Sequence, residues 1–231
     1  MAGFFGIGVG PGDPDLLTIK AIKTIRHLDI LYTPMAKKSA PSFAMQIAYS
    51  YLPKNLMIKH RYFPMTNNLK EKQIQWHRIT TEILTDVQGG KNVGFITLGD
   101  PAIYSTFSYL VNLLKNKILV KTIAGISSFS QMANKLSLPL ILGKEFLGVI
   151  SATASEKKIN QAIDINDTLI IMKISLGLNK VFKLLKEKKL LKNALIIKNI
   201  SLPNQDSIRL SKISPKENLP YFSTLLLKKS F

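Results

Sequence analysis

The segment that most constrains the fold is residues 93–110, VGFITLGDPAIYSTFSYL. Its first part, Val93 to Leu98, is a largely apolar and β-branched run, which is typical of a buried strand in a parallel sheet. The Gly-Asp-Pro turn at residues 99–101 ends this run, and a second apolar run begins at Ile103. The segment therefore predicts a strand, a tight turn and a helix. Because open α/β sheets bind ligands at the carboxyl ends of their strands, this turn is a candidate binding loop, with an ordinary connecting loop as the alternative.

Alternating signals for strands and helices continue on both sides of this segment. Apolar or β-branched runs predict further strands at residues 4–9, 29–32, 56–63, 118–123, 146–151, 168–174, 194–200 and 221–227. Helical spacing predicts helices at 16–27, 43–51, 69–87, 156–163 and 178–191, and another that leaves the turn at 124–129 and ends at 136. Polar loops are expected at 37–42 and 202–205. This alternation indicates an α/β protein with parallel strands.

The length of the chain favours two domains. At 231 residues it exceeds a typical single domain of about 100–150 residues. A basic link at residues 115–117 precedes the second half of the chain. We therefore expect an N-terminal α/β domain at residues 1–116 and a C-terminal α/β domain at residues 117–231.

Composition excludes several kinds of site. The chain has no cysteine, so it cannot form a disulfide, a thiolate nucleophile or a cysteine-ligated metal site. His60 and His77 lack partners at metal-ligand spacing, so we expect no metal. No apolar run reaches the roughly 18–20 residues of a membrane span, and the N-terminus lacks the features of a signal peptide. We expect a cytoplasmic protein without a membrane partner.

The formal net charge of +18 raises the question of a nucleic-acid partner. Only four of the 32 basic residues are arginine, the residue best suited to bidentate phosphate and base contacts, and the lysines are spread along the whole chain. This pattern favours compositional drift or a polyanionic substrate drawn in by electrostatic steering, and we expect no nucleic-acid partner. A basic nucleic-acid-binding module without catalysis remains the alternative from another functional class.

A glycine-rich loop follows the first predicted strand, with the sequence GVGPGDPD at residues 8–15. It has neither the GxGxxG spacing of a dinucleotide fingerprint nor the GK[ST] ending of a P-loop. Asp13 and Asp15 would repel a phosphate. Either carboxylate can cap the next helix or contact a substrate.

Four motifs together resemble those of the tetrapyrrole methylases, the S-adenosylmethionine-dependent enzymes of corrin and sirohaem synthesis. These motifs are GIGVGPGDPDLLTIKA, TLGDPAIYSTFSYL, AGISSFS and LIIMK, and the resemblance covers essentially the whole chain in order. Within the family, FPMT at Phe63 to Thr66, Trp76 and the ending YFSTLLL are most similar to precorrin-2 carbon-20 methyltransferases of the cobalamin pathway. The resemblance implies two αβα domains with mixed, largely parallel sheets, a homodimer, and S-adenosylmethionine in a cleft between the domains.

The resemblance also implies the site residues. The residues expected to bind the cofactor are Leu98, Gly99, Asp100, Ile103, Tyr104, Ser127, Ser128, Met172 and Ile200. The residues expected on the substrate side are Pro11, Gly12 and Asp13. Ala124 and Ser127 stand where the family usually has proline and threonine, and Ile200 stands where a small residue is common.

The implied reaction is an in-line transfer of the sulfonium methyl group to carbon 20 of a reduced tetrapyrrole. Alignment of the two reactants can supply about 7–11 kcal/mol of the barrier in favourable cases. A base must take a proton, and Asp13, Tyr104 and solvent are the candidates. The same fold and cofactor can also serve another corrin precursor, diphthine or ribosomal RNA, which is the alternative within the family.

Overall fold

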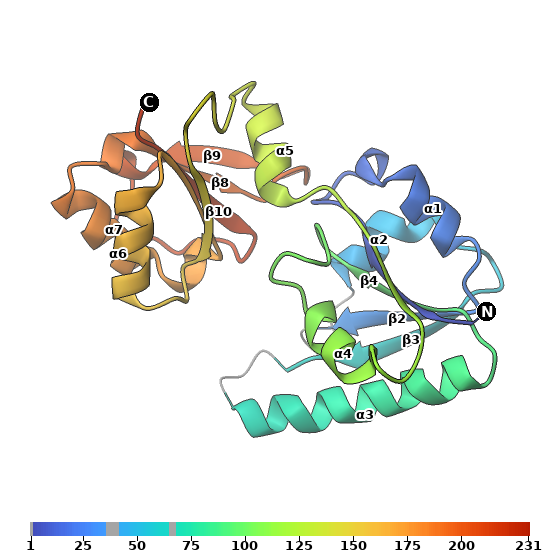
Figure 1. Cartoon of the computed structure of the whole chain (residues 1–231). Helices are drawn as coiled ribbons and strands as arrows, with labels where there is room; N and C mark the ends of the chain where they lie inside the picture. Colours follow the sequence, from blue (N-terminus) through green and yellow to red (C-terminus); the bar gives the residue numbers. More distant parts are fainter. Residues whose placement is uncertain (1, 36–41, 65–67) are drawn as a thin grey trace. The chain divides into compact units, whose positions relative to one another are not determined.

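The computed structural model describes residues 2–35, 42–64 and 68–231 (Figure 1). The chain forms two compact units, Met1–Ser127 and Ser128–Phe231, which are called here the N-terminal unit and the C-terminal unit. The division comes after the expected boundary at residue 116. The strand at Val120–Ile123 pairs in register with the first strand of the chain, so it completes the sheet of the N-terminal unit.

The N-terminal unit is built on a parallel five-stranded sheet with strand order β3-β2-β4-β1-β5. Its strands are β1 (Phe4–Gly8), β2 (Ile30–Met35), β3 (Met57–Tyr62), β4 (Val93–Thr97) and β5 (Val120–Ile123). Its helices are α1 (Ile19–Ile25), α2 (Phe43–Ala48), α3 (Leu69–Gln88) and α4 (Phe107–Leu114), with 3-10 turns at Pro14–Leu16 and Tyr49–Tyr51.

Helices cover both faces of this sheet (Figure 1). On one face, Phe4 and Phe95 pack with buried residues of α3 and α4. On the other face, Ile7 and Ile96 pack with buried residues of α1 and α2. The three central strands β1, β2 and β4 are largely buried, so they read as near-continuous apolar runs that the sequence predicts well.

The C-terminal unit contains a mixed five-stranded sheet with strand order β6-β7-β10-β8-β9. Its strands are β6 (Leu147–Ser151), β7 (Thr168–Met172), β8 (Ala194–Lys198), β9 (Asp206–Arg209) and β10 (Ser223–Lys228). Strands β6 and β7 are parallel, whereas β10 runs antiparallel to β7 and β8, and β9 runs antiparallel to β8. The helices are α5 (Ser128–Lys135), α6 (Glu156–Ile165) and α7 (Leu178–Glu187), with 3-10 turns at Ile174–Leu176, Leu191–Asn193 and Leu210–Lys212. The expected α/β class with largely parallel strands is confirmed.

Several elements differ from their predicted bounds for local reasons. The helix expected from residue 16 begins at Ile19, because Thr18 caps it by accepting from the backbone N–H of Ala21, while Asp13 caps the preceding 3-10 turn. The helix expected from Ile103 begins only at Phe107. Strand β9 was not predicted. Most of the polar loop expected at 37–42 and the second half of the FPMT motif lie outside the described residues.

Within the described parts of the chain, no helix combines the length and the apolar character needed to cross a bilayer.

Candidate functional site

Three loops of the N-terminal unit meet at one edge of its sheet. They follow β1 (residues 9–18), β4 (residues 98–106) and β5 (residues 124–127), and these three strands are neighbours in the order β4-β1-β5. Because the strands are parallel, their carboxyl ends lie at the same edge, which is where open α/β sheets bind ligands. These loops are called here the three-loop edge.

Backbone hydrogen bonds join the first two loops. The amide of Gly99 donates to the carbonyl of Gly10 at 2.8 Å, and the amide of Gly10 donates back to Gly99 at 3.3 Å. The amide of Val9 donates to the carbonyl of Thr97 at 3.0 Å, which extends the β1–β4 pairing into the loops. Thr18 Oγ1 reaches the third loop by donating to the carbonyl oxygen of Ala124 at 3.3 Å.

The third loop approaches the other two so closely that only glycine fits. A Cβ on Gly125 would lie 2.3 Å from the carbonyl oxygen of Gly99 and 2.8 Å from Cα of Gly8. A Cβ on Gly8 would lie 2.7 Å from the backbone nitrogen of Gly125. The glycine-rich first loop therefore serves backbone packing between strands, in agreement with the absence of a phosphate-loop motif.

Asp100 connects the second loop to the third. One of its carboxylate oxygens accepts from the backbone N–H of Ala102 at 2.8 Å, within the same turn. The other accepts from the backbone N–H of Gly125 at 3.1 Å. The proposed cofactor residue is thus bonded to two backbone amides of the protein itself.

The second loop also contains strained backbone. Gly99 has φ +69°, which glycine adopts without cost, but Tyr104 has φ +48° and its side chain is exposed. Non-glycine residues in this region cost about 1–3 kcal/mol and gather at functional sites. Ser105 Oγ bonds Thr97 Oγ1 at 2.9 Å and accepts from the backbone N–H of Phe107 at 3.1 Å, and these bonds explain the late start of α4.

The three-loop edge is free of basic residues. Residues 4–19, 93–114 and 122–127 contain no lysine or arginine, although the chain has 32 of them. The same stretches contain the carboxylates Asp13, Asp15 and Asp100. Carboxylate and carbonyl oxygens accept hydrogen bonds and favour cations, so this edge suits a cationic group and disfavours a phosphate. A positively charged sulfonium cofactor such as S-adenosylmethionine fits this set of groups.

The expected substrate-side residues lie in the first loop. Pro11 and Gly12 are buried. Asp13 is half-buried and accepts from the backbone N–H of Asp15 at 2.9 Å, so it has a capping role whatever else it does. The structure thus brings Pro11, Gly12 and Asp13 to the same edge as the residues at 98–104.

The remaining expected cofactor residues lie at the junction of the units and in the C-terminal unit. Ser127 ends the third loop, and Ser128 is the first residue of α5. Met172 ends β7 and Ile200 follows β8. Because β7 and β8 both run antiparallel to the β10 strand between them, Met172 and Ile200 come from the same edge of the second sheet.

The side chain of Ile200 belongs to the core of the C-terminal unit. It is only 7% exposed and clusters with Met132 and Ile197, and Met172 packs against the same cluster. Residues with positive φ flank both positions: Lys173 at +56°, Asn199 at +53° and Ser201 at +60°. These bends end β7 and β8 before residues 174 and 200, where the sequence pattern predicted that the strands continue.

Two residues at these edges were missed as site candidates. Gly125 lies within the AGISSFS motif, and its role depends on a close contact with Gly8 that no local sequence pattern reveals. Tyr221 precedes β10 at the same edge of the second sheet as Met172; it is 44% exposed and packs edge-on against Phe222 at 5.3 Å. Its signal was an aromatic residue at the start of a predicted strand.

Across residues 2–35, 42–64 and 68–231, no group of three histidine or carboxylate side chains is arranged to hold a metal ion. His60 Nδ1 lies 2.6 Å from Thr33 Oγ1, which satisfies one of its ring nitrogens.

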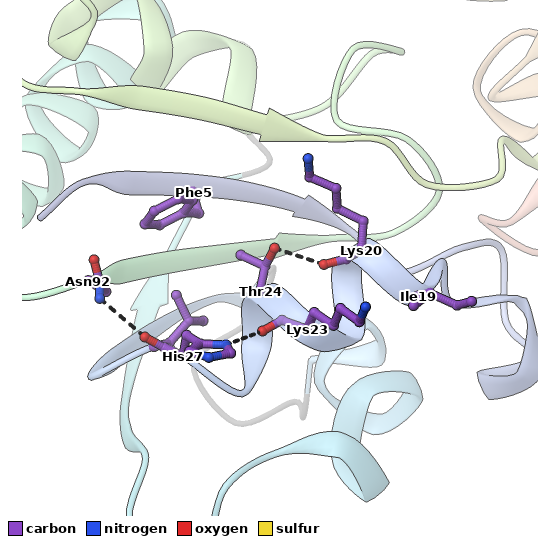
Figure 2. Close-up of a pocket in the computed structure, with 8 residues that line it drawn as sticks. Phe5, Ile19, Lys20, Lys23, Thr24, His27 and Asn92 are labelled. Carbon is purple, nitrogen blue, oxygen red and sulfur yellow. Dashed lines mark hydrogen bonds between the residues drawn. The ribbon is translucent and has the colours of Figure 1, made fainter. Parts of the chain in front are cut away.

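A separate cavity of about 630 Å³ lies along α1, with Phe5 at its floor and Lys20, Lys23 and His27 at its rim (Figure 2). His27 Nδ1 bonds the carbonyl oxygen of Lys23 at 2.7 Å, and Thr24 donates to the carbonyl oxygen of Lys20 at 2.8 Å. The polar rim is therefore the solvated face of a helix bonded to its own backbone, and it contains no residue of the three-loop edge.

Comparison with known sequences supports the motif resemblance. The family model of Tetrapyrrole (Corrin/Porphyrin) Methylases matches residues 3–213. The chain is 34% identical over 228 residues to a cobalt-precorrin-2 C(20)-methyltransferase of Salmonella typhimurium, covering 98% of this chain and 96% of the relative. It is 36% identical to a probable cobalt-precorrin-2 C(20)-methyltransferase of Methanocaldococcus jannaschii, covering 80% of this chain and 77% of the relative.

Solved structures share the fold. A cobalt precorrin-4 methyltransferase aligns with a TM-score of 0.74 at 17% identity, covering 97% of this chain and 94% of that one. A uroporphyrin-III C-methyl transferase from Thermus thermophilus, complexed with S-adenyl homocysteine, aligns with a TM-score of 0.71 at 17% identity, covering 99% of this chain and 92% of that one. With the family model matched over most of its length, this chain belongs to the tetrapyrrole methylase family.

Proposed function

We propose that this protein is an S-adenosylmethionine-dependent C-methyltransferase that methylates carbon 20 of precorrin-2, or of its cobalt form, in cobalamin biosynthesis. The observation that carries the proposal is the 34% identity to a cobalt-precorrin-2 C(20)-methyltransferase along almost the whole of both chains. A relative named as a uroporphyrinogen-III C-methyltransferase is 28% identical over 78% of this chain, against 34% over 98% for the Salmonella typhimurium relative. A methyltransferase of the same fold that acts on another substrate is therefore the second candidate function.

The geometry of the three-loop edge supports a cationic methyl donor. When bound, S-adenosylmethionine supplies a methyl group already activated by its sulfonium charge. We propose that Leu98, Gly99, Asp100, Ile103 and Tyr104 form the part of the cofactor site that lies in the N-terminal unit. The edge offers it carboxylate and carbonyl oxygens and no competing ammonium or guanidinium group. We propose the remaining cofactor contacts at Ser127, Ser128, Met172 and Ile200.

The tetrapyrrole is proposed to lie against the first loop, at Pro11, Gly12 and Asp13. The new bond forms between carbon 20 and the methyl carbon as the bond from sulfur to that carbon breaks, and carbon 20 then loses a proton. Asp13 and Tyr104 are the proposed acceptors, since both lie in loops of the same edge. A catalytic base contributes only in its deprotonated form, so kcat depends on its titration. Replacing the residue that acts as the base is therefore expected to remove one limb of the pH profile of kcat.

The substrate test incubates the purified protein with labelled S-adenosylmethionine and either metal-free precorrin-2 or its cobalt chelate. The expected result is addition of one methyl group, read by mass, and the preferred chelation state identifies the true substrate. Uroporphyrinogen III serves as the control substrate, since relatives named for it share the fold. Methylation of uroporphyrinogen III alone, or no transfer to any of the three, would contradict the assignment.

We propose further that the enzyme acts in the cytoplasm as a homodimer, with no nucleic-acid or membrane partner. The family resemblance supports this assembly. Light scattering coupled to size-exclusion chromatography measures the mass directly, and the expected value is twice that of the 25.8 kDa chain. A mass of one chain would contradict the homodimer.

A further inference from the structure

The carboxylate of Asp100 divides its hydrogen bonds between two loops. One oxygen holds the N–H of Ala102 in its own turn, and the other holds the N–H of Gly125, 25 residues further along the chain. Among the described residues, no lysine, arginine or histidine forms an ion pair with it. Backbone amides are thus the groups in the described protein that stabilise this half-buried charge.

Gly125 is the point at which the third loop approaches the second most closely. Its Cα region is packed against the carbonyl of Gly99 and against Gly8, with no space for a side chain. The carbonyl oxygen of Ile126, the next residue, lies 4.0 Å from the position that a Cβ on Gly99 would take, and it is the nearest atom to that position. Any shift of Gly125 therefore moves the backbone that borders Gly99.

We propose that Asp100 is a positioning residue, whose carboxylate holds the loop after β5 against the loop after β4 and acts on the methyl donor through the backbone of Gly99 and residues 125–127. The inference rests on the proposed function for the identity of the ligand. It departs from a direct role, in which the carboxylate would contact the cationic part of the cofactor.

The two roles predict different dependence on ligand charge. S-adenosylmethionine has a sulfonium and an ammonium group, S-adenosylhomocysteine retains only the ammonium, and 5′-methylthioadenosine has neither. A carboxylate that contacts a cationic group contributes only to ligands with that group. A carboxylate that positions the backbone contributes to all three.

The experiment measures the affinity of the full chain for these three ligands by calorimetry. Asp100→Ala and Asp100→Asn are compared with wild type, and Glu71→Gln is the control because it removes an exposed carboxylate of the same unit outside the three-loop edge. We expect Asp100→Ala to weaken all three ligands by a similar factor, about tenfold or more, from the loss of a charge-assisted hydrogen bond. Asp100→Asn keeps one acceptor oxygen and is expected to recover part of the loss, while Glu71→Gln leaves all three affinities unchanged. A loss confined to the charged ligands, or no loss, would overturn the positioning role.

A second measurement tests the same role without any ligand. Hydrogen exchange at the Gly125 amide of the folded protein is expected to be slow in wild type and faster in both Asp100 variants, with circular dichroism unchanged. Unaltered protection of Gly125 in Asp100→Ala would overturn the positioning role. If wild type binds none of the three ligands, the proposed function fails, and the Gly125 amide still decides whether Asp100 holds the loop.

Discussion

Replacing Gly125 by alanine places a methyl group where three backbone segments meet. The new Cβ would stand 2.3 Å from the carbonyl oxygen of Gly99 and 2.8 Å from both Cα and the carbonyl carbon of Gly8. Contacts under 3.0 Å are essentially never seen for real Cβ atoms, so the loops must separate. The atoms in the way belong to the backbone of neighbouring strands, which cannot rotate aside as a side chain can.

The expected cost follows from two effects. Overpacking of a tight interior site costs about 1–3 kcal/mol. A separation of about 0.7 Å, the least that restores a tolerable contact, also stretches the 3.1 Å bond from Gly125 to Asp100 beyond hydrogen-bond range, and a bond to a charged group contributes about 1.5–3 kcal/mol. We therefore expect Gly125→Ala to lower the free energy of unfolding of the N-terminal unit by about 3–5 kcal/mol.

The chain provides its own probe for this measurement. Its single tryptophan, Trp76, lies on α3 of the N-terminal unit and stacks on Tyr109 of α4, with ring centroids 4.2 Å apart and planes inclined by 10°. Loss of this stacking on unfolding changes tryptophan fluorescence, so a urea titration reports the N-terminal unit without interference from the other unit. Calorimetry with S-adenosylhomocysteine then measures the site, and binding is expected to be lost in Gly125→Ala.

Gly94→Ala is the matched control. Its Cβ would also meet an atom at 2.3 Å, but that atom is the methyl end of Leu28, which can change rotamer. We expect Gly94→Ala to cost about 1–2 kcal/mol and to retain cofactor binding. If the two variants lose equal stability, or if Gly125→Ala binds S-adenosylhomocysteine like wild type, the tight packing of the three loops is refuted.

Three further predictions concern charge. Burial, together with the hydrogen bond to Asp86, raises the pKa of Tyr32 far above its ordinary value. Tyr32→Phe is therefore expected to leave the tyrosinate absorbance of the native protein near pH 10 unchanged and to remove one of seven tyrosines from the denatured titration. A loss of tyrosinate absorbance in the native titration would contradict this prediction. The hydrogen bond from buried Lys228 lowers the pKa of Glu145. The stability that this carboxylate contributes is therefore present above its ordinary pKa of about 4.3 and is lost as the pH falls through the folded value. Glu145→Gln is expected to flatten the acid side of the stability profile, measured by urea titration at each pH, and an equally steep profile would count against this prediction. Ala102→Lys introduces an ammonium group at an exposed position of the three-loop edge. In calorimetry it is expected to weaken the binding of S-adenosylmethionine several-fold more than that of S-adenosylhomocysteine, whereas the neutral Ala102→Gln affects both affinities alike. Equal losses of affinity in the lysine variant would argue against a sulfonium site.

The centre of the N-terminal sheet could be predicted from sequence because β1, β2 and β4 are largely buried. Residues 93–97 are all buried, so no polar residue interrupts the run. The edge strand β9, Asp206–Arg209, could not be predicted, because its residues are mostly exposed and its only signal is pairing with β8. The ends of β7 and β8 could not be predicted either, because the sequence does not indicate that Lys173 and Asn199 adopt positive φ.

The sequence locates the turn of the proposed site but not the contacts within it. The turn at 99–101 followed a recognisable strand, and the topology then placed it beside the first and third loops. That the carboxylate of Asp100 bonds Gly125 depends on β5 pairing with β1, a non-local contact that sequence periodicity does not encode. The two compact units divide at Ser127, after the boundary expected at residue 116, because β5 pairs with β1.

The distribution of lysine across the chain separates drift from function. A chain with 28 lysines and four arginines has accepted lysine wherever an exposed position tolerates it, including the solvated face of α1 beside the three-loop edge. Yet residues 93–114 contain none, although Ala102, Tyr104 and Ser108 are exposed there. Burial excludes lysine from the strand and from the inner face of α4, but it does not exclude lysine from these positions. An ammonium group at this edge would repel a cationic donor and compete for the oxygens of the turn, whereas elsewhere on the surface it has no such effect. The absence of lysine from these exposed positions is what a site for a cationic donor is expected to show, and it supports the proposed site at the turn of residues 99–101 without reference to any motif.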